Sequence, residues 1–162
     1  MRKTIVVLVA LCVAPELFAQ NTGLVQTTTV TLTSAQLQNL RANPITLVAA
    51  PGAGNYVNAT SAILQYKAGG AAYGLPGGGN LSITIGAPAN GNTTFVSTDL
   101  AATGFIDKLK NQVRVPRPVF VNDSESNLAN QELRVSNDGD AEWISGDGTV
   151  TITVFYTIVA LQ

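Results

Sequence analysis

The side chains of this sequence whose types and spacing come nearest to a chemical site lie in residues 137–142. Asp138, Asp140 and Glu142 place carboxylate groups two residues apart, and alternating oxygen ligands are typical of calcium-binding loops. An EF-hand is excluded, because Trp143 stands where that motif requires a glycine. The pattern leaves two interpretations open, a calcium site and a solvated acidic connection between two strands.

Two aromatic residues could serve a ligand beside this loop. The ring of Trp143 could stack on a sugar, and Tyr73 lies in the glycine-rich stretch 69–79. Together with the three carboxylates they predict a calcium-assisted carbohydrate site. The alternative is that Trp143 belongs to the core or its rim, as a lone tryptophan beside a strand usually does.

The chain beyond residue 19 contains neither histidine nor cysteine. Cysteine nucleophiles, histidine general bases and histidine-ligated metal sites are therefore excluded there. A glycosidase needs two opposed carboxylates, but the acidic residues gather in segments that read as turns. We predict a protein that is not an enzyme and that has no cofactor other than calcium at the acidic loop.

Residues 1–19 have the pattern of an export signal. Arg2 and Lys3 precede an apolar run over residues 5–14, Pro15 ends that run, and Ala19 suits a cleavage site. The run is too short to span a membrane, which takes about 20 apolar residues. We expect cleavage after Ala19, no transmembrane segment in the remaining chain, and a secreted, periplasmic or cell-surface location.

The charge of the remaining chain is small. Seven basic and nine acidic residues are left once Arg2, Lys3 and Glu16 are set aside. Four of the basic residues fall within 108–117, which makes a local patch only. A nucleic-acid partner is therefore not expected, because it would require a broad positive surface.

The stretch 146–160 is the clearest strand signal in the chain. Its apolar and threonine residues alternate strictly, and β-branched and aromatic side chains dominate it. We expect one face to bury in a core: Val150, Ile152, Val154, Tyr156 and Ile158. The threonine face turns apolar at Phe155 and Val159. That change predicts cover at this end by a neighbouring element or another subunit.

A second long strand is expected over residues 56–66. Regular alternation would place these residues on one face: Val57, Ala59, Ser61, Ile63 and Gln65. The opposite face would then carry Tyr56, Asn58, Thr60, Ala62, Leu64 and Tyr66. Shorter strands are expected over 24–32, 45–49, 80–85, 93–97 and 133–135. Residues 113–121 contain two prolines, which restrict them to an edge strand or a loop.

Helix is limited to one or two short turns. Thr33 and Gln36 have the spacing of a capping box, and Pro44 follows shortly afterwards. Many short strands separated by Gly, Pro and Asn turns predict an all-β protein with a single jelly-roll-like β-sandwich domain over residues 20–162. A closed β-barrel is the alternative.

Several motifs resemble one family of proteins. They are NPITLV at 43–48, APGAG at 50–54, NQEL at 130–133 and GDGTVTITVFY at 146–156. Together they resemble small, mostly uncharacterised β-proteins encoded among the structural genes of tailed phages, over most of residues 31–159. The resemblance implies a virion-associated or surface structural role and carries over no functional site. The predicted signal peptide departs from that family.

Two functional hypotheses follow. The first is an exported structural or surface protein that self-assembles, with a homo-oligomer as the expected state and virion or cell-surface components as further partners. The second is a carbohydrate- or surface-binding module that uses the calcium-assisted site. Burial of Trp143 and Tyr73, or their exposure side by side, distinguishes the two.

Overall fold

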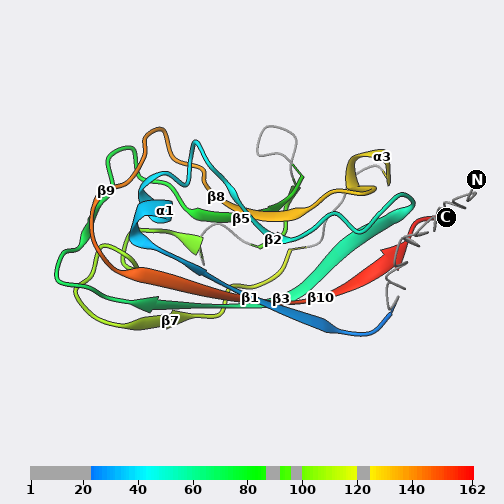
Figure 1. Ribbon diagram of the computed structural model, residues 1–162, viewed down its shortest axis with the longest axis horizontal. Helices are drawn as coiled ribbons and strands as arrows, with labels where there is room; N and C mark the ends of the chain where they lie inside the picture. The colour runs from blue at the N-terminus through cyan, green and yellow to red at the C-terminus, as the bar shows by residue number, and fades with distance from the viewer. Residues whose placement is uncertain (1–22, 87–91, 96–99, 120–124) are drawn as a thin grey trace, which may run out of the picture.

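The computed structural model describes residues 23–86, 92–95, 100–119 and 125–162. The predicted signal peptide, residues 1–19, lies outside these ranges. Within them the chain forms two four-stranded antiparallel sheets and one two-stranded pair (Figure 1).

The two larger sheets each contain four strands. The first sheet has the order β1-β10-β3-β7 and consists of β1 (Gln26–Leu32), β10 (Thr149–Ala160), β3 (Asn55–Lys67) and β7 (Gln112–Arg114). The second sheet has the order β2-β8-β5-β6 and consists of β2 (Ile45–Val48), β8 (Leu133–Asn137), β5 (Leu81–Ile85) and β6 (Asn92–Thr93). The short pair joins β4 (Tyr73–Gly74) to β9 (Ile144–Ser145).

The strand pairing is nested. β1 pairs with β10, β2 with β8, β3 with β7, and β5 with β6, all antiparallel. This is the pairing of one long antiparallel hairpin wrapped into two layers, which defines a jelly roll. The all-β, jelly-roll prediction is thus confirmed. Both sheets end in free edge strands, so the closed barrel named as the alternative is not formed.

The core lies between the two layers. From β10 it receives Val150, Ile152, Val154 and Ile158, all buried as the alternation predicted, while Tyr156 is only half-buried. From the second sheet it receives Leu81, Ile83, Ile85, Leu133 and Val135. The apolar faces of β10, β5 and β8 are therefore buried between the two sheets, as in other sandwiches.

The predicted faces of β3 are wrong beyond its middle. Val57 and Ala59 are buried, and Ala62, Leu64 and Tyr66, which regular alternation would place on the opposite face, are buried with them. Phe155 pairs with Ser61 and Tyr156 with Ala59, which leaves Thr60 without a partner in the ladder. This β-bulge reverses the parity of the strand, so that residues of the two predicted faces share one core.

The helical turns are short. α1 (Ser34–Gln38) begins at the predicted capping box: the Gln36 backbone N–H donates to the Thr33 hydroxyl at 3.3 Å, and the Thr33 N–H donates to Gln36 Oε1 at 2.9 Å. α3 (Glu125–Leu128) lies close to β3. β7 is an edge strand, as predicted for the segment 113–121, of which residues 120 and 121 lie outside the described ranges.

Candidate functional site

The carboxylates of the predicted calcium loop bind backbone groups of other segments. Asp138 accepts hydrogen bonds from the Asn80 backbone N–H at 2.7 Å and from the Asn80 side-chain amide at 2.9 Å. Glu142 accepts from the backbone N–H groups of Arg41 at 3.0 Å and Ala42 at 2.6 Å. Each carboxylate thus fastens the loop to a different part of the fold.

The loop is also closed on itself by a buried amide. The Asn137 side chain donates to the Ala141 carbonyl at 2.9 Å and accepts from the Gly139 N–H at 2.8 Å. The Arg41 side chain adds a hydrogen bond of 2.8 Å to the Gly139 carbonyl. These contacts hold the loop to itself and to the Arg41 side chain.

Within the part of the chain that the structure describes, no three acidic, histidine or cysteine side chains gather as they would around a metal. Asp138 and Glu142 point to separate segments, and Asp140 is exposed and makes no hydrogen bond to a described residue. The geometry gives the predicted calcium site no support, and that site stays a prediction.

Both predicted sugar-stacking residues are part of the core. Trp143 is 1% exposed and donates from its indole nitrogen to the Gly78 carbonyl at 3.0 Å. Tyr73 is 3% exposed and donates from its hydroxyl to the Gly148 carbonyl at 2.7 Å. A ring must present a free face to stack on a sugar. In this arrangement neither ring does, so the glycan platform remains a prediction without structural support.

A neighbouring carboxylate, which the sequence did not single out, holds the glycine-rich loop. Asp147 accepts hydrogen bonds from the backbone N–H groups of Ala71 at 2.9 Å and Gly70 at 3.0 Å. These bonds hold the pKa of the Asp147 carboxyl below its usual value. Gly69 leaves room for this carboxylate, because a Cβ at that position would lie 2.0 Å from Asp147 Oδ1.

Burial beside these groups also changes the pKa of Tyr73. Removal from water raises the pKa of Tyr73 above its ordinary value, and the charge of Asp147 adds to the effect. Tyr73 therefore stays protonated and keeps donating to Gly148.

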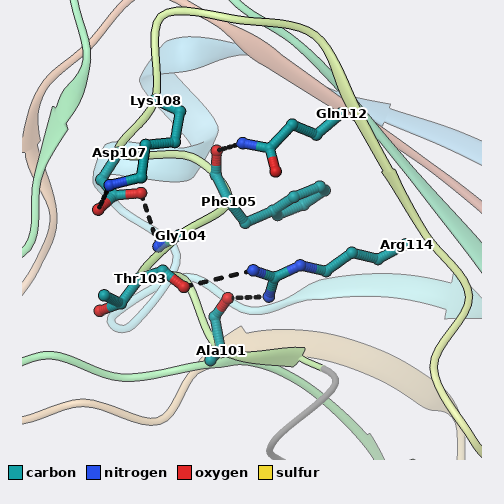
Figure 2. A network of polar contacts seen from close by, with 8 residues as sticks. All are labelled: Ala101, Thr103, Gly104, Phe105, Asp107, Lys108, Gln112 and Arg114. Atoms are coloured by element: carbon teal, nitrogen blue, oxygen red, sulfur yellow. Dashed lines mark hydrogen bonds and ion pairs between the residues drawn. The ribbon is translucent and has the colours of Figure 1, made fainter.

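Arg114, one of the four basic residues of the predicted patch over 108–117, belongs to a network of polar contacts that Figure 2 shows. The Arg114 guanidinium lies 4.7 Å from the centre of the Phe105 ring and donates to the carbonyls of Ala101 and Thr103. Gln112 donates to the Phe105 carbonyl at 2.9 Å. A cation over a buried ring, with its donors on main-chain carbonyls, stabilises a loop. This part of the patch is therefore not free to bind a polyanion.

Asp107 completes that network at the turn. It accepts from the Gly104 N–H at 2.7 Å and pairs with Lys108 at 2.9 Å (Figure 2). Gly104 has a positive φ of 78°, which suits glycine. The sequence gave no signal for the arginine–phenylalanine contact, which depends on β7 lying beside the loop.

The outer face of the first sheet is a surface that the sequence analysis did not single out as a site. β1 and β10 present two parallel rows of threonines there: Thr27, Thr29, Thr31, Thr149, Thr151, Thr153 and Thr157. Hydroxyl contacts join the two rows, at 3.1 Å between Thr29 and Thr153 and at 2.9 Å between Thr31 and Thr151. These bonds hold the threonines in one orientation.

The same face continues across the sheet with few charges. Thr151 pairs with Gln65 and Gln65 with Val113, so that with Thr31 one row of uncharged residues crosses all four strands. A shallow groove of about 620 Å³ follows this row, and Lys67 at its edge is the charged residue among those lining it. The surface is hydroxyl-rich and almost neutral, which suits contact with another protein surface better than binding of an ionic ligand.

Among the described residues no helix is long and apolar enough to cross a bilayer. No protein-family model matches the chain, and no curated protein matches it. Among solved structures, the chain is similar to one in the structure titled "Cyanophage Pam1 capsid asymmetric unit", with a TM-score of 0.40 and 16% sequence identity. That alignment covers 97% of this chain and 99% of the other.

Proposed function

We propose that this protein is a non-enzymatic structural subunit that assembles with copies of itself. The observation that carries the proposal is the outer face of the first sheet, where exposed and half-exposed threonines cover β1 and β10 without a charged residue between them. Protein interfaces are distinguished by depletion of charge at their centre, whereas a solvated sheet face usually carries charged side chains.

The acidic groups nearest to a site also support a structural role. Asp138, Glu142 and Asp147 each accept hydrogen bonds from backbone N–H groups of segments that are distant in the sequence. A catalytic carboxylate must instead reach a substrate in an open cleft. These three groups therefore stabilise the scaffold that presents the threonine face.

We infer the setting from the first residues of the sequence. The export pattern over residues 1–19 supports assembly outside the cytoplasm, in the periplasm, at the cell surface or in the medium. Partners of a second kind, from a virion or a cell surface, would add to the contacts between copies. Mass spectrometry of the protein purified from the exporting cell tests this setting, and an N-terminus at Gln20 is the expected result.

Light scattering coupled to size-exclusion chromatography tests the assembly itself. We expect the chain that begins at Gln20 to form oligomers whose mass rises with protein concentration from micromolar to millimolar. Lysozyme of similar size, run in the same buffer, controls for non-specific association. A mass that stays at one chain throughout the range would refute self-assembly.

A further inference from the structure

β1 is an edge strand without the features that usually protect an edge. Its seven residues pair with β10 in regular register, and no described strand lies on its other side. Natural edge strands are protected by lysine, proline, bulges or very short length. Residues 23–33, GLVQTTTVTLT, contain no charged residue and no proline. This edge is therefore ready to accept another strand.

The composition of β1 fits a second copy of itself. Thr29 is the midpoint of the strand, so an antiparallel pair centred there would match all seven residues of each copy. Thr29 would then oppose Thr29 of the second copy, and Thr27 would oppose Thr31. Threonine pairs across antiparallel strands are favourable, and the chain already forms two of them between β1 and β10.

The two faces also match under this symmetry. Thr27, Thr29 and Thr31 are exposed on the outer side of the sheet, and Thr28 and Val30 lie half-buried on the inner side. A two-fold axis at Thr29 brings outer residues opposite outer residues and Thr28 opposite Val30. Because residues 23–33 are uncharged, no like charges meet across the axis. Leu24 and Val25, which are 58% and 65% exposed, directly precede β1 in the chain.

We propose that β1 pairs antiparallel with β1 of a second copy of this chain about a two-fold axis at Thr29, which joins the two first sheets into one continuous sheet. This inference rests on the proposed self-assembly and adds one specific contact to it, at the β1 edge of the threonine face. The threonine rows would then run across both copies as one neutral surface. Closed two-fold pairing of identical patches is the commonest form of homo-oligomer.

Disulfide trapping tests the position of the axis. In a Cys12→Ser background, Thr29→Cys would bring two cysteines directly opposite each other. Opposed residues of antiparallel strands have Cα atoms about 4.5–5.5 Å apart, within the range of a disulfide. Thr153→Cys is the matched control, since it lies on the same face one strand further in. Its counterpart would be three strand spacings away, about 14 Å, which a disulfide does not span.

The expected result is a disulfide-linked dimer on a non-reducing gel for Thr29→Cys and not for Thr153→Cys, with the link at residue 29 confirmed by mass spectrometry. A second pair of variants avoids oxidation. Thr29→Lys should weaken association by about tenfold or more, because like charges opposite each other destabilise a strand pair. Asp140→Lys, at an exposed position outside both β1 and the threonine face and checked for folding by circular dichroism alongside it, should leave association unchanged.

The outcomes separate the two proposals. If the wild-type chain associates but Thr29→Cys does not cross-link and Thr29→Lys associates normally, the β1 contact is wrong and self-assembly stands. The same conclusion holds if another protein or the residues preceding β1 are found to cover the edge. If the wild-type chain is monomeric at every concentration, both proposals fail.

Discussion

Asp138 holds Asn80 by two atoms at once: its carboxylate lies 2.7 Å from the Asn80 backbone nitrogen and 2.9 Å from the side-chain nitrogen. Asn80 precedes β5 and Asp138 follows β8, so the pair joins the ends of two adjacent strands of the second sheet. The aspartate that the sequence analysis predicted as a calcium ligand therefore joins two strand ends through its hydrogen bonds.

Replacing Asp138 should cost stability. We expect Asp138→Ala to lower the free energy of unfolding by about 1–2 kcal/mol, because hydrogen bonds to a charged group are lost at a partly solvated position. Asp140→Ala, two residues away and exposed, is the control and should change it by less than about 0.5 kcal/mol. Urea denaturation midpoints at constant m-value measure both. If both variants lost the same free energy of unfolding, the hydrogen bonds between Asp138 and Asn80 would not be the source of the effect.

The wild type and Asp140→Ala together test whether the loop binds calcium. With Asp138 and Glu142 bound to backbone groups, we expect the melting temperature of the wild type to be the same in millimolar calcium and in chelator. A ligand that binds only the native state raises the melting temperature as its concentration rises. A calcium-dependent rise that disappears in Asp140→Ala would restore the calcium loop predicted from the sequence.

Asp147 should make stability depend on pH. Its folded-state pKa is lowered by the N–H groups of Ala71 and Gly70, so its contribution is present above the unfolded-state value of about 3.9 and is lost as the pH falls through the folded-state value. Asp147→Asn should therefore be less stable than the wild type at pH 7. The difference between them should shrink below about pH 4.

Denaturant midpoints of wild type and Asp147→Asn from pH 7 to pH 3 measure this effect. Asp140→Asn serves as the control, because it removes an exposed carboxylate that makes no hydrogen bond to a described residue. A gap between wild type and Asp147→Asn that is constant over the whole range would mean that the aspartate does not act through its charge.

The long C-terminal strand shows what the sequence could predict well. Val150, Ile152 and Val154 lie at every second position and are all fully buried, because one regular strand places alternate residues on one face. The capping box at Thr33 was equally readable, since both partners lie within four residues. Features of this kind depend on local sequence alone.

The two faces of β10 should differ in their response to truncation. Ile152→Ala should lower the free energy of unfolding by about 2–5 kcal/mol, as removal of a buried isoleucine does. Thr151→Ala should cost less than about 1.5 kcal/mol, because it removes a half-exposed hydroxyl and its contact with Thr31. Urea denaturation of a monomeric sample measures both. Equal losses would mean that the outer face is covered within one subunit.

The candidate site was harder to predict because its contacts join distant residues. Trp143 has a sequence environment that suits a sugar platform as well as a core, and only the position of Gly78, 65 residues earlier, settles its burial. Arg114 stacks on Phe105 because β7 returns beside that loop. Spacing along the chain carries no information about such approaches, so these roles could not be inferred from the sequence.

The β-bulge in β3 is another feature that could not be predicted from local sequence, although it lies within one strand. Residues 56–66 alternate in a way that suits a regular strand, yet Val57 and Leu64 face one core. Thr60 is the extra residue, and its hydroxyl donates to the Phe155 carbonyl at 3.1 Å. The parity change follows from pairing with β10, because the inserted residue has no partner there.

Deleting Thr60 should therefore be tolerated. Without it, Ala59 and Ser61 become consecutive and alternate inward and outward, so the buried residues on both sides keep their faces. We expect a folded protein whose free energy of unfolding falls by less than about 2 kcal/mol, chiefly through loss of the hydroxyl contact. Circular dichroism and urea denaturation measure the result.

Deletion of Thr153 is the matched control, because it removes one residue from the partner strand β10, which has no extra residue of its own to absorb the loss. It shifts every residue on one side of the gap to the opposite face, which would turn Val154 and Ile158 outward. That variant should fail to fold, while the Thr60 deletion keeps its cooperative transition. If both deletions abolish folding, the bulge is required for the strand itself, and Thr60 does more than occupy an unpaired position in the ladder.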